Sequence, residues 1–309
     1  MKPRLGLALG AGSAKGWAHI GVLRALEELG LRPDVVAGTS IGALVGAAYV
    51  TDHLDDLEAW VTSLSWTDVL TLLDIRLSGG LIRGDRVINR LSEHLRDVVI
   101  EQLSRPFAAV ATELDNGNEC WLRDGPILDA VRASIALPGL FSPIKLRDRW
   151  LVDGGLVNPV PVSLCRAIGA DVVIAVDLST QIFLREGDGI SGDRFSLKSR
   201  EGDAAGVSDR ILEMFQGMLG RFRGRPVADD PLPSILDVAI RSLNIMSVRI
   251  SRSRLAGEPP DLLLSPKVGD IALMEFHRAD EAIALGRAEV QRRAPEFESI
   301  RHYLAREVR

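Results

Sequence analysis

The stretch that decides the fold is LGLALGAGSAKGWAHIGVLRALEELGLRPDVVAGTSIGALVGAAYV, residues 5–50. Its first run, Leu5–Leu9, is short and apolar, and it ends at a glycine-rich loop, residues 10–16, that opens a helical pattern stopping at Gly30. A second apolar run, Val35–Ala37, leads into a sharp turn, residues 38–42, and an alanine-rich helix. Strands that alternate with helices in this way are typical of an α/β protein with parallel strands.

The alternation continues toward the C-terminus. Strand-like apolar runs occur at 107–112, 119–122, 150–152, 172–176 and 262–264, and helical spacing occurs at 54–64, 87–95, 127–135, 162–168, 210–222, 234–255 and 278–292. We therefore predict an α/β sandwich whose central sheet is mostly parallel. Three segments are expected: a core over 5–184, a variable insertion over 185–255 made of a mobile loop and helices, and a strand and helix over 256–309 that complete the core.

Composition excludes several classes of protein. The net charge of −5 is dispersed over 309 residues, which does not indicate a nucleic-acid partner. The two cysteines, Cys120 and Cys165, are too few and too separated for a disulfide framework or a metal cluster, so neither a metal nor a cofactor is expected. The longest uncharged run, Val35–Val50, contains a turn and is shorter than the roughly 20 residues of a membrane span. A cytoplasmic location is favoured, and peripheral membrane contact stays open.

A serine lies in the turn between the second strand and its helix. In Gly38-Thr39-Ser40-Ile41-Gly42 the residues two before and two after Ser40 are glycines, as a nucleophile elbow requires. The N–H of Ile41 opens the following helix and can stabilise developing negative charge. The alternative is a glycine-flanked turn in which Ser40 only caps the helix.

The loop Gly10-Ala11-Gly12-Ser13-Ala14-Lys15-Gly16 admits three interpretations. It is not a P-loop, because the Gly-Lys order is reversed. It loosely fits a dinucleotide-binding loop, but the acidic residue that should hold a ribose is missing from the end of the second strand, since Asp34 precedes that strand. The third interpretation is an oxyanion hole built from the backbone N–H groups of Gly12, Ser13 and Ala14.

A serine nucleophile needs a base, and the five histidines are poorly placed for that role. His19 lies among apolar residues of the first helix, where a structural role is favoured. His277 has the late position of a hydrolase histidine, but no acid or turn marks it. Asp153 ends an apolar strand, and Gly154-Gly155 lets the chain turn away so that the carboxylate faces the crevice; a simple turn is the alternative.

The chain resembles the patatin-like phospholipase family, close to its small bacterial RssA-like branch. Matching blocks occur in the family's order at Ala11–Gly16, Gly38–Gly42, Ser134–Gly139, Asp153–Gly155 and Asn158–Pro161, within a similarity that spans roughly 5–180 and returns at 251–286. The resemblance implies a three-layer α/β/α sandwich with a mostly parallel central sheet, and a Ser40–Asp153 dyad without a catalytic histidine. The family's loop is usually Gly-Gly-Gly-x-Arg/Lys-Gly, and Ala11 and Ser13 replace two of its glycines here. For Lys15 a structural role is favoured over attraction of an anionic head group.

The resulting hypothesis is a serine esterase that acts through an acyl-enzyme, on phospholipid or lysophospholipid esters. An aspartate base with an ordinary pKa of about 3.9 requires desolvation to work near neutral pH, and so weak a base favours esters over amides. The alternative is a catalytically weak lipid-sensing or regulatory protein on the same fold, and a dinucleotide-binding oxidoreductase is a distant third. Residues 210–255 are the candidate surface for pairing subunits or for meeting a membrane.

Overall fold

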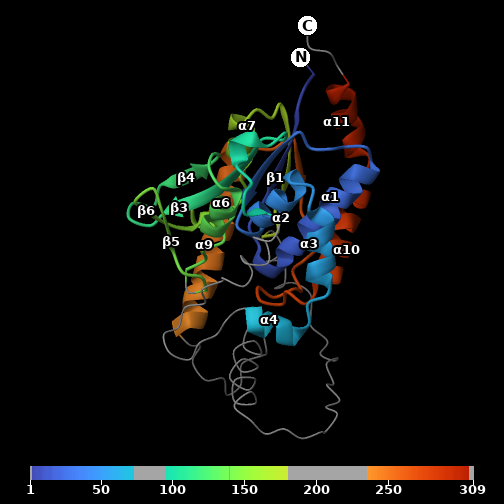
Figure 1. Ribbon diagram of the computed structural model, residues 1–309. Helices are drawn as coiled ribbons and strands as arrows, with labels where there is room; N and C mark the ends of the chain where they lie inside the picture. Colours follow the sequence, from blue (N-terminus) through green and yellow to red (C-terminus); the bar gives the residue numbers. More distant parts are fainter. Residues whose placement is uncertain (1, 73–94, 139, 180–234, 306–309) are drawn as a thin grey trace, which may run out of the picture.

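The computed structural model describes residues 2–72, 95–138, 140–179 and 235–305. The predicted helix over 210–222 and the predicted loop over 185–210 lie outside these ranges, as does the predicted helix over 87–95 apart from Leu95. An eight-stranded sheet forms the middle layer of the described part (Figure 1). Its strands are β1 (Leu5–Leu9), β2 (Val35–Thr39), β3 (Phe107–Glu113), β4 (Glu119–Leu122), β5 (Ile144–Leu146), β6 (Arg149–Asp153), β7 (Val172–Val176) and β8 (Leu262–Leu264).

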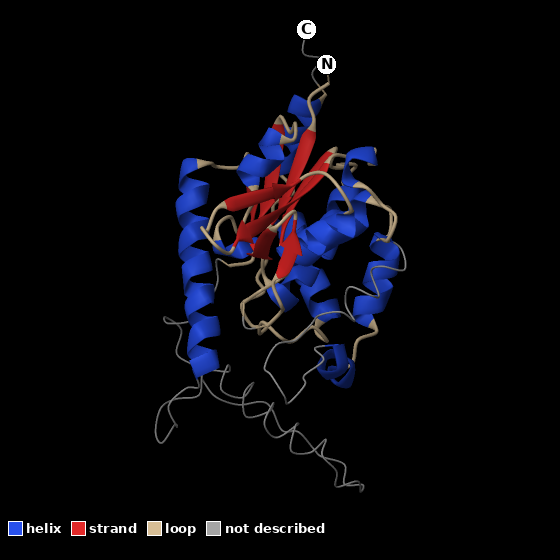
Figure 2. Cartoon of the chain, turned by 60° about the vertical axis from the view of Figure 1, so that its left-hand side comes forward, coloured by secondary structure: helices blue, strands red, loops and turns tan. Residues whose placement is uncertain are grey.

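Helices cover both faces of the sheet (Figure 2). They are α1 (Ala18–Glu28), α2 (Ile41–Val50), α3 (Leu54–Thr62), α4 (Trp66–Leu72), α6 (Ile127–Ser134), α7 (Val162–Ala167), α9 (Ile235–Gly257), α10 (Ala279–Arg292) and α11 (Glu296–Leu304), with short 3₁₀ turns η1 (Ser13–Trp17), η2 (Ile100–Gln102) and η3 (Gly154–Leu156). None of the described helices combines the length and the apolar character needed to cross a membrane.

The parallel part of the sheet has the order β3-β2-β1-β7-β8. Successive side chains of a strand point to opposite faces. Leu5, Leu7 and Leu9 therefore pack into the core shared with α1, α2, α3, α10 and α11, and Ala8 packs into the second core under α7. Burial on both faces explains why these strands read as continuous apolar runs. The arrangement confirms the predicted three-layer α/β/α sandwich.

Strand β3 joins the parallel and antiparallel parts of the sheet. Its Val110 pairs with Trp121 of β4 and with Thr39 of β2, and its Ala111 pairs with Cys120 of β4 and with Asp153 of β6. Because β4 occupies one side of β3 at both positions, β2 and β6 must share the other side. The parallel strand β2 and the antiparallel strand β6 thus run toward each other along the same side of β3. They end opposite Val110 and Ala111, which are adjacent residues of β3.

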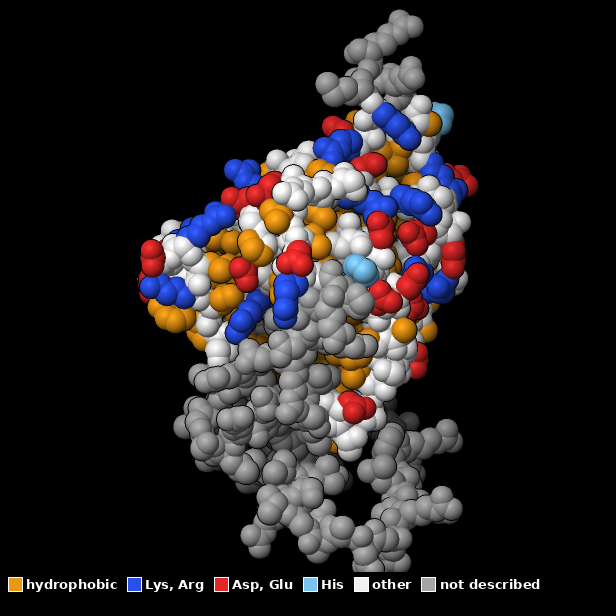
Figure 3. All heavy atoms as spheres, viewed as in Figure 1, with side chains coloured by type: hydrophobic (Ala, Val, Ile, Leu, Met, Phe, Trp, Pro, Cys, Tyr) orange, Lys and Arg blue, Asp and Glu red, His pale blue; other side chains and the backbone are white. Residues whose placement is uncertain are grey.

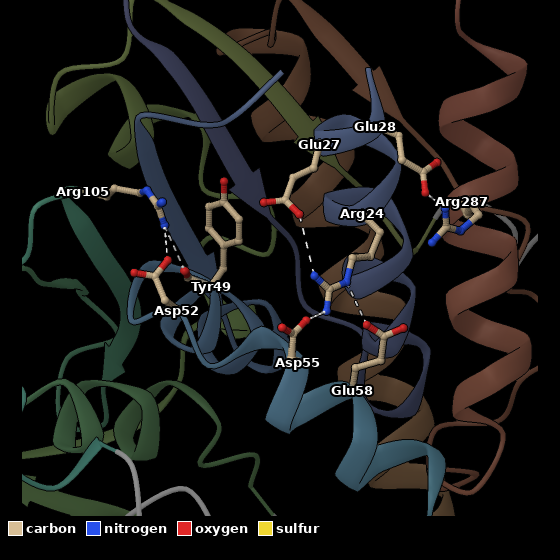
Figure 4. Close-up of polar contacts among 9 residues, drawn as sticks. All are labelled: Arg24, Glu27, Glu28, Tyr49, Asp52, Asp55, Glu58, Arg105 and Arg287. Atoms are coloured by element: carbon tan, nitrogen blue, oxygen red, sulfur yellow. Dashed lines mark hydrogen bonds and ion pairs between the residues drawn. The ribbon is translucent and has the colours of Figure 1, made fainter. Parts of the chain in front are cut away.

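Charged side chains tie the outer helices together (Figure 4). Arg24 of α1 bonds to Asp55 and, at 2.8 Å, to Glu58, both on α3, and Glu28 of α1 pairs with Arg287 of α10. Elsewhere on the visible face, cationic and anionic side chains are interspersed (Figure 3). Exposed pairs of this kind each contribute about 0–1 kcal/mol, so the apolar cores dominate the stability.

Candidate active site

Ser40 lies in a sharp turn at the carboxyl end of β2. Its φ of 56° and ψ of −126° fall in a region that non-glycine residues rarely adopt, so the turn is strained. A Cβ atom at Gly42 would collide with the carbonyl groups of Leu9 and Gly10, so only glycine lets the first turn of α2 pack against the end of β1. The geometry is that of a nucleophile elbow.

The partner of the Ser40 hydroxyl is the Asp153 carboxylate. Ser40 Oγ donates to Asp153 Oδ2 at 2.6 Å, and the Gly155 N–H donates to Asp153 Oδ1 at 2.7 Å. Only 2% of Asp153 is exposed, and burial raises the pKa of its carboxyl to about 6, although the hydrogen bonds from Ser40 and Gly155 oppose that rise. The predicted pair is therefore in direct contact, and the carboxylate is a stronger base than an exposed aspartate.

A second serine holds the nucleophile's backbone. The Ser40 N–H donates to Ser134 Oγ at 2.8 Å, and the Ser134 hydroxyl donates to the Val110 carbonyl at 2.6 Å. The same segment contacts the other member of the pair, because the Asp153 N–H donates to the Ala136 carbonyl at 2.9 Å. The sequence marked Ser134 only as part of a motif block. Its role depends on three segments meeting in space.

The glycine-rich loop follows β1 and is anchored at both ends. The Gly10 N–H donates to the Val176 carbonyl at 3.0 Å, and the Ala11 N–H donates to the Pro159 carbonyl at 2.9 Å. The Ala14 N–H donates to the Leu273 carbonyl at 3.1 Å, so this predicted oxyanion donor is already engaged. Within the described ranges the amides of Gly12 and Ser13 have no such acceptor, which leaves these two as the loop's candidate donors. Ser13 holds a positive φ of 49°, a conformation that glycine adopts more easily.

Of the described histidines, neither His19 nor His277 is bonded to Ser40. His19 Nε2 lies 2.8 Å from the Gly10 carbonyl, so this nitrogen must be the donor, and burial lowers the pKa of the ring to about 4. A neutral His19 thus supports the start of the glycine-rich loop. The His277 ring packs edge-on against Trp66, with ring centroids 5.1 Å apart.

Two pockets meet at Ser40. One, of about 60 Å³, is almost entirely apolar, and the other, of about 70 Å³, is partly polar. The apolar pocket is lined by Ser13, Trp17, Ser40, Ile41, Leu44, Trp60, Leu64, Val69, Ile135, Leu137, Phe141 and Phe276. The second pocket, named the polar pocket, has a mostly apolar surface into which polar residues also project: Lys15 and Asp153, together with Asp177 after β7 and Asn244 and Ser247 of α9, with Gly12 beside them. Sequence reasoning missed Asp177, whose only signal is that it is the first polar residue after β7.

The residues of a dinucleotide site or a metal site are not brought together in the described part of the chain. Asp34 Oδ2 accepts the Leu5 N–H at 2.9 Å, at the amino ends of β1 and β2, whereas the glycine-rich loop lies at their carboxyl ends. The acidic group of a dinucleotide site is therefore at the wrong edge of the sheet. In the described part of the chain, no three His, Cys, Asp or Glu side chains group closely enough to hold a metal ion.

A family model and several known proteins are similar to this chain. The family model described as patatin-like phospholipase matches residues 7–166. A protein of Mycobacterium tuberculosis named as an uncharacterized NTE family protein is 34% identical, over 93% of this chain and 90% of its own length. A second such protein from the same organism is 31% identical over 92% of this chain and 45% of its own length. Among solved structures, VipD from Legionella pneumophila aligns over 98% of this chain and 78% of its own, with 12% identity and a TM-score of 0.38.

Proposed function

The chain belongs to the patatin-like phospholipase family, and we propose that it is a serine esterase that hydrolyses acyl esters of lipids through a Ser40–Asp153 dyad. The observation that carries this proposal is the 2.6 Å hydrogen bond from the Ser40 hydroxyl to a buried carboxylate, at the junction of an apolar and a polar pocket. Phospholipid and lysophospholipid esters are the proposed substrates, because they combine a long apolar chain with a polar alcohol.

The chemistry follows from this geometry. Asp153 accepts the Ser40 proton while Oγ attacks the ester carbonyl, and the tetrahedral oxyanion accepts hydrogen bonds from the Gly12 and Ser13 amides. Asp153 then returns the proton to the leaving alcohol. Water, deprotonated by Asp153, attacks the acyl-enzyme and releases the fatty acid and the free Ser40 hydroxyl.

The pockets orient the substrate. Ser40 lines both pockets, whereas Asp153 lines only the polar one. The group that receives a proton from Asp153 is the leaving alcohol, so the alcohol belongs in the polar pocket. The acyl chain then occupies the apolar pocket, where burial of each methylene contributes about 0.8 kcal/mol.

Covalent labelling tests the proposed nucleophile. A fluorophosphonate is expected to modify Ser40 in the wild type, and Ser40→Ala is expected to lose both the label and ester turnover. Ser13→Ala, which removes another hydroxyl of the same pocket while keeping its backbone amide, serves as the matched control and should still be labelled at Ser40. Full turnover by Ser40→Ala on a panel of lipid esters would contradict the proposal.

Trp60→Ala tests the assignment of the apolar pocket. Removing this indole deepens the pocket, so the preferred acyl chain is expected to lengthen by several carbons. The control is Trp150→Ala, an equal change at a side chain that is 45% exposed on β6 and outside the pocket. Hydrolysis of a series of p-nitrophenyl esters gives the comparison. An unchanged chain-length optimum in Trp60→Ala would place the acyl chain elsewhere.

A further inference from the structure

One charged side chain of α9 reaches the turn that carries the dyad aspartate. Arg254 forms an ion pair with Glu119, the first residue of β4, and its Nε donates to the Val157 carbonyl at 3.2 Å. Its Nη1 also lies 3.6 Å from Glu258. The Glu119 side chain is only 18% exposed, so water screens its ion pair with Arg254 weakly.

Glu119 connects Arg254 to the buried side chain of Asn158. Its Oε1 accepts Asn158 Nδ2 at 2.7 Å and also accepts Trp121 Nε1 at 2.6 Å. Asn158 is 1% exposed, and its Nδ2 lies 3.3 Å from Ser163 Oγ as well. The amide of Asn158 is thus held in one orientation by Glu119.

The backbone of Asn158 completes the connection to the nucleophile. The Asn158 N–H donates to the Gly154 carbonyl at 2.9 Å, which closes the turn after Asp153. The Asn158 carbonyl accepts Thr39 Oγ1 at 2.8 Å, and Thr39 is the residue before Ser40. A single residue therefore links the Asp153 turn to the end of β2.

We propose that Arg254 and Glu119 are positioning residues of the dyad, which lock Val157 and Asn158 so that the Asp153 turn and the Ser40 elbow keep their mutual geometry. This inference rests on the proposed function, because the geometry that it protects is the one used in catalysis. Neither residue lines the two pockets at Ser40, so their removal leaves substrate contacts intact. A 1 Å displacement of reacting groups can slow an enzyme by about 10²-fold.

The test compares Arg254→Met and Glu119→Gln with wild type and with Arg254→Lys. Both disruptive variants are expected to lower kcat by at least tenfold with KM within twofold of wild type, and Arg254→Lys, which keeps the ion pair, is expected to recover part of kcat. The matched control is Arg166→Met. Arg166 lies on α7, away from the dyad, and its Nη2 pairs with Asp261 Oδ2 at 3.0 Å. A wild-type kcat in Arg254→Met and Glu119→Gln, or an equal loss in Arg166→Met, would overturn the inference.

A readout without activity separates this inference from the proposed function. If wild type hydrolyses none of the esters tested, the proposed function fails, and coupling in thermal unfolding then decides the positioning role. Arg254→Met and Thr39→Val are expected to be non-additive in Tm by at least 2 °C, since Asn158 links the two sites, whereas Arg166→Met and Thr39→Val should be additive. Additive shifts in the first pair would refute the connection.

Discussion

Replacing Asp153 by asparagine is expected to abolish ester turnover and to make the fold more stable. Asparagine has the same shape, so its Oδ1 can accept the Gly155 N–H and its Nδ2 can donate to Ser40 Oγ, while the Ser40 hydroxyl proton, which loses its acceptor, can turn toward water in the pockets. It cannot accept the Ser40 proton, and loss of a general base costs about 10²- to 10⁴-fold in rate.

The stability gain follows from the burial of the carboxylate. Burial raises the pKa of Asp153 from 3.8 to about 6. Each pKa unit corresponds to about 1.4 kcal/mol, so at neutral pH the ionised carboxylate destabilises the folded state by about 3 kcal/mol relative to a protonated one. Because an amide makes weaker hydrogen bonds than a carboxylate, a net gain of about 1 to 3 kcal/mol is expected in Asp153→Asn. Denaturant unfolding at pH 7 measures this gain, with Asp148→Asn, at a 96% exposed side chain, as the control. A less stable Asp153→Asn protein would contradict the predicted burial penalty.

The second large effect is an acid limb in the rate. Only the ionised Asp153 can accept the Ser40 proton, so kcat/KM is expected to fall about tenfold for each pH unit below about 6. His19 adds no limb near neutrality, because burial keeps its pKa at about 4. Initial rates on a soluble ester between pH 4 and 8 provide the measurement. A profile flat down to pH 5 would mean that Asp153 is not the titrating base.

The two buried groups change stability with pH in opposite directions. Between its unfolded pKa of 3.8 and its folded pKa of about 6, Asp153 holds a proton only in the folded state, so its contribution to stability falls as pH rises. Between about 4 and 6.5, His19 holds a proton only in the unfolded state, so its contribution rises with pH. The two nearly cancel in wild type. In Asp153→Asn the opposing contribution of Asp153 is gone, and stability is expected to fall as pH drops from 6.5 to about 4.

Sequence patterning located the buried strands well because they have no exposed face. The structure places β1, β7 and β8 at the predicted Leu5–Leu9, Val172–Val176 and Leu262–Leu264. The short strand β5 was missed. It is joined to β6 by Arg147 and Asp148, which adopt positive φ values of 48° and 63° without the Asn-Gly pair that usually marks such a hairpin. The helix α11 was missed as well, and the segment boundaries at 184 and 255 stay predictions.

The candidate site was predictable where one residue type dictates the chemistry. Ser40 and Asp153 are each marked by neighbouring glycines, and the structure brings the two side chains into contact. Contacts between distant, unremarkable residues have no such signal. The engagement of the Ala14 amide by Leu273 and the pairing of Arg254 with Glu119 both depend on loops and helices that meet only in the folded chain.

The meeting of β2 and β6 along β3 has a consequence for how the chain tolerates change. Ser40 and Asp153 are 113 positions apart in the sequence, but Asp153 and Thr39, the residue before Ser40, pair with the adjacent residues Ala111 and Val110 of β3. The distance between them is therefore set by the spacing of adjacent residues in β3, and it does not depend on the length of chain between the two residues. Loop insertions between the two halves, such as at the exposed Asn116-Gly117 turn, would lengthen the protein and leave the spacing of the dyad unchanged.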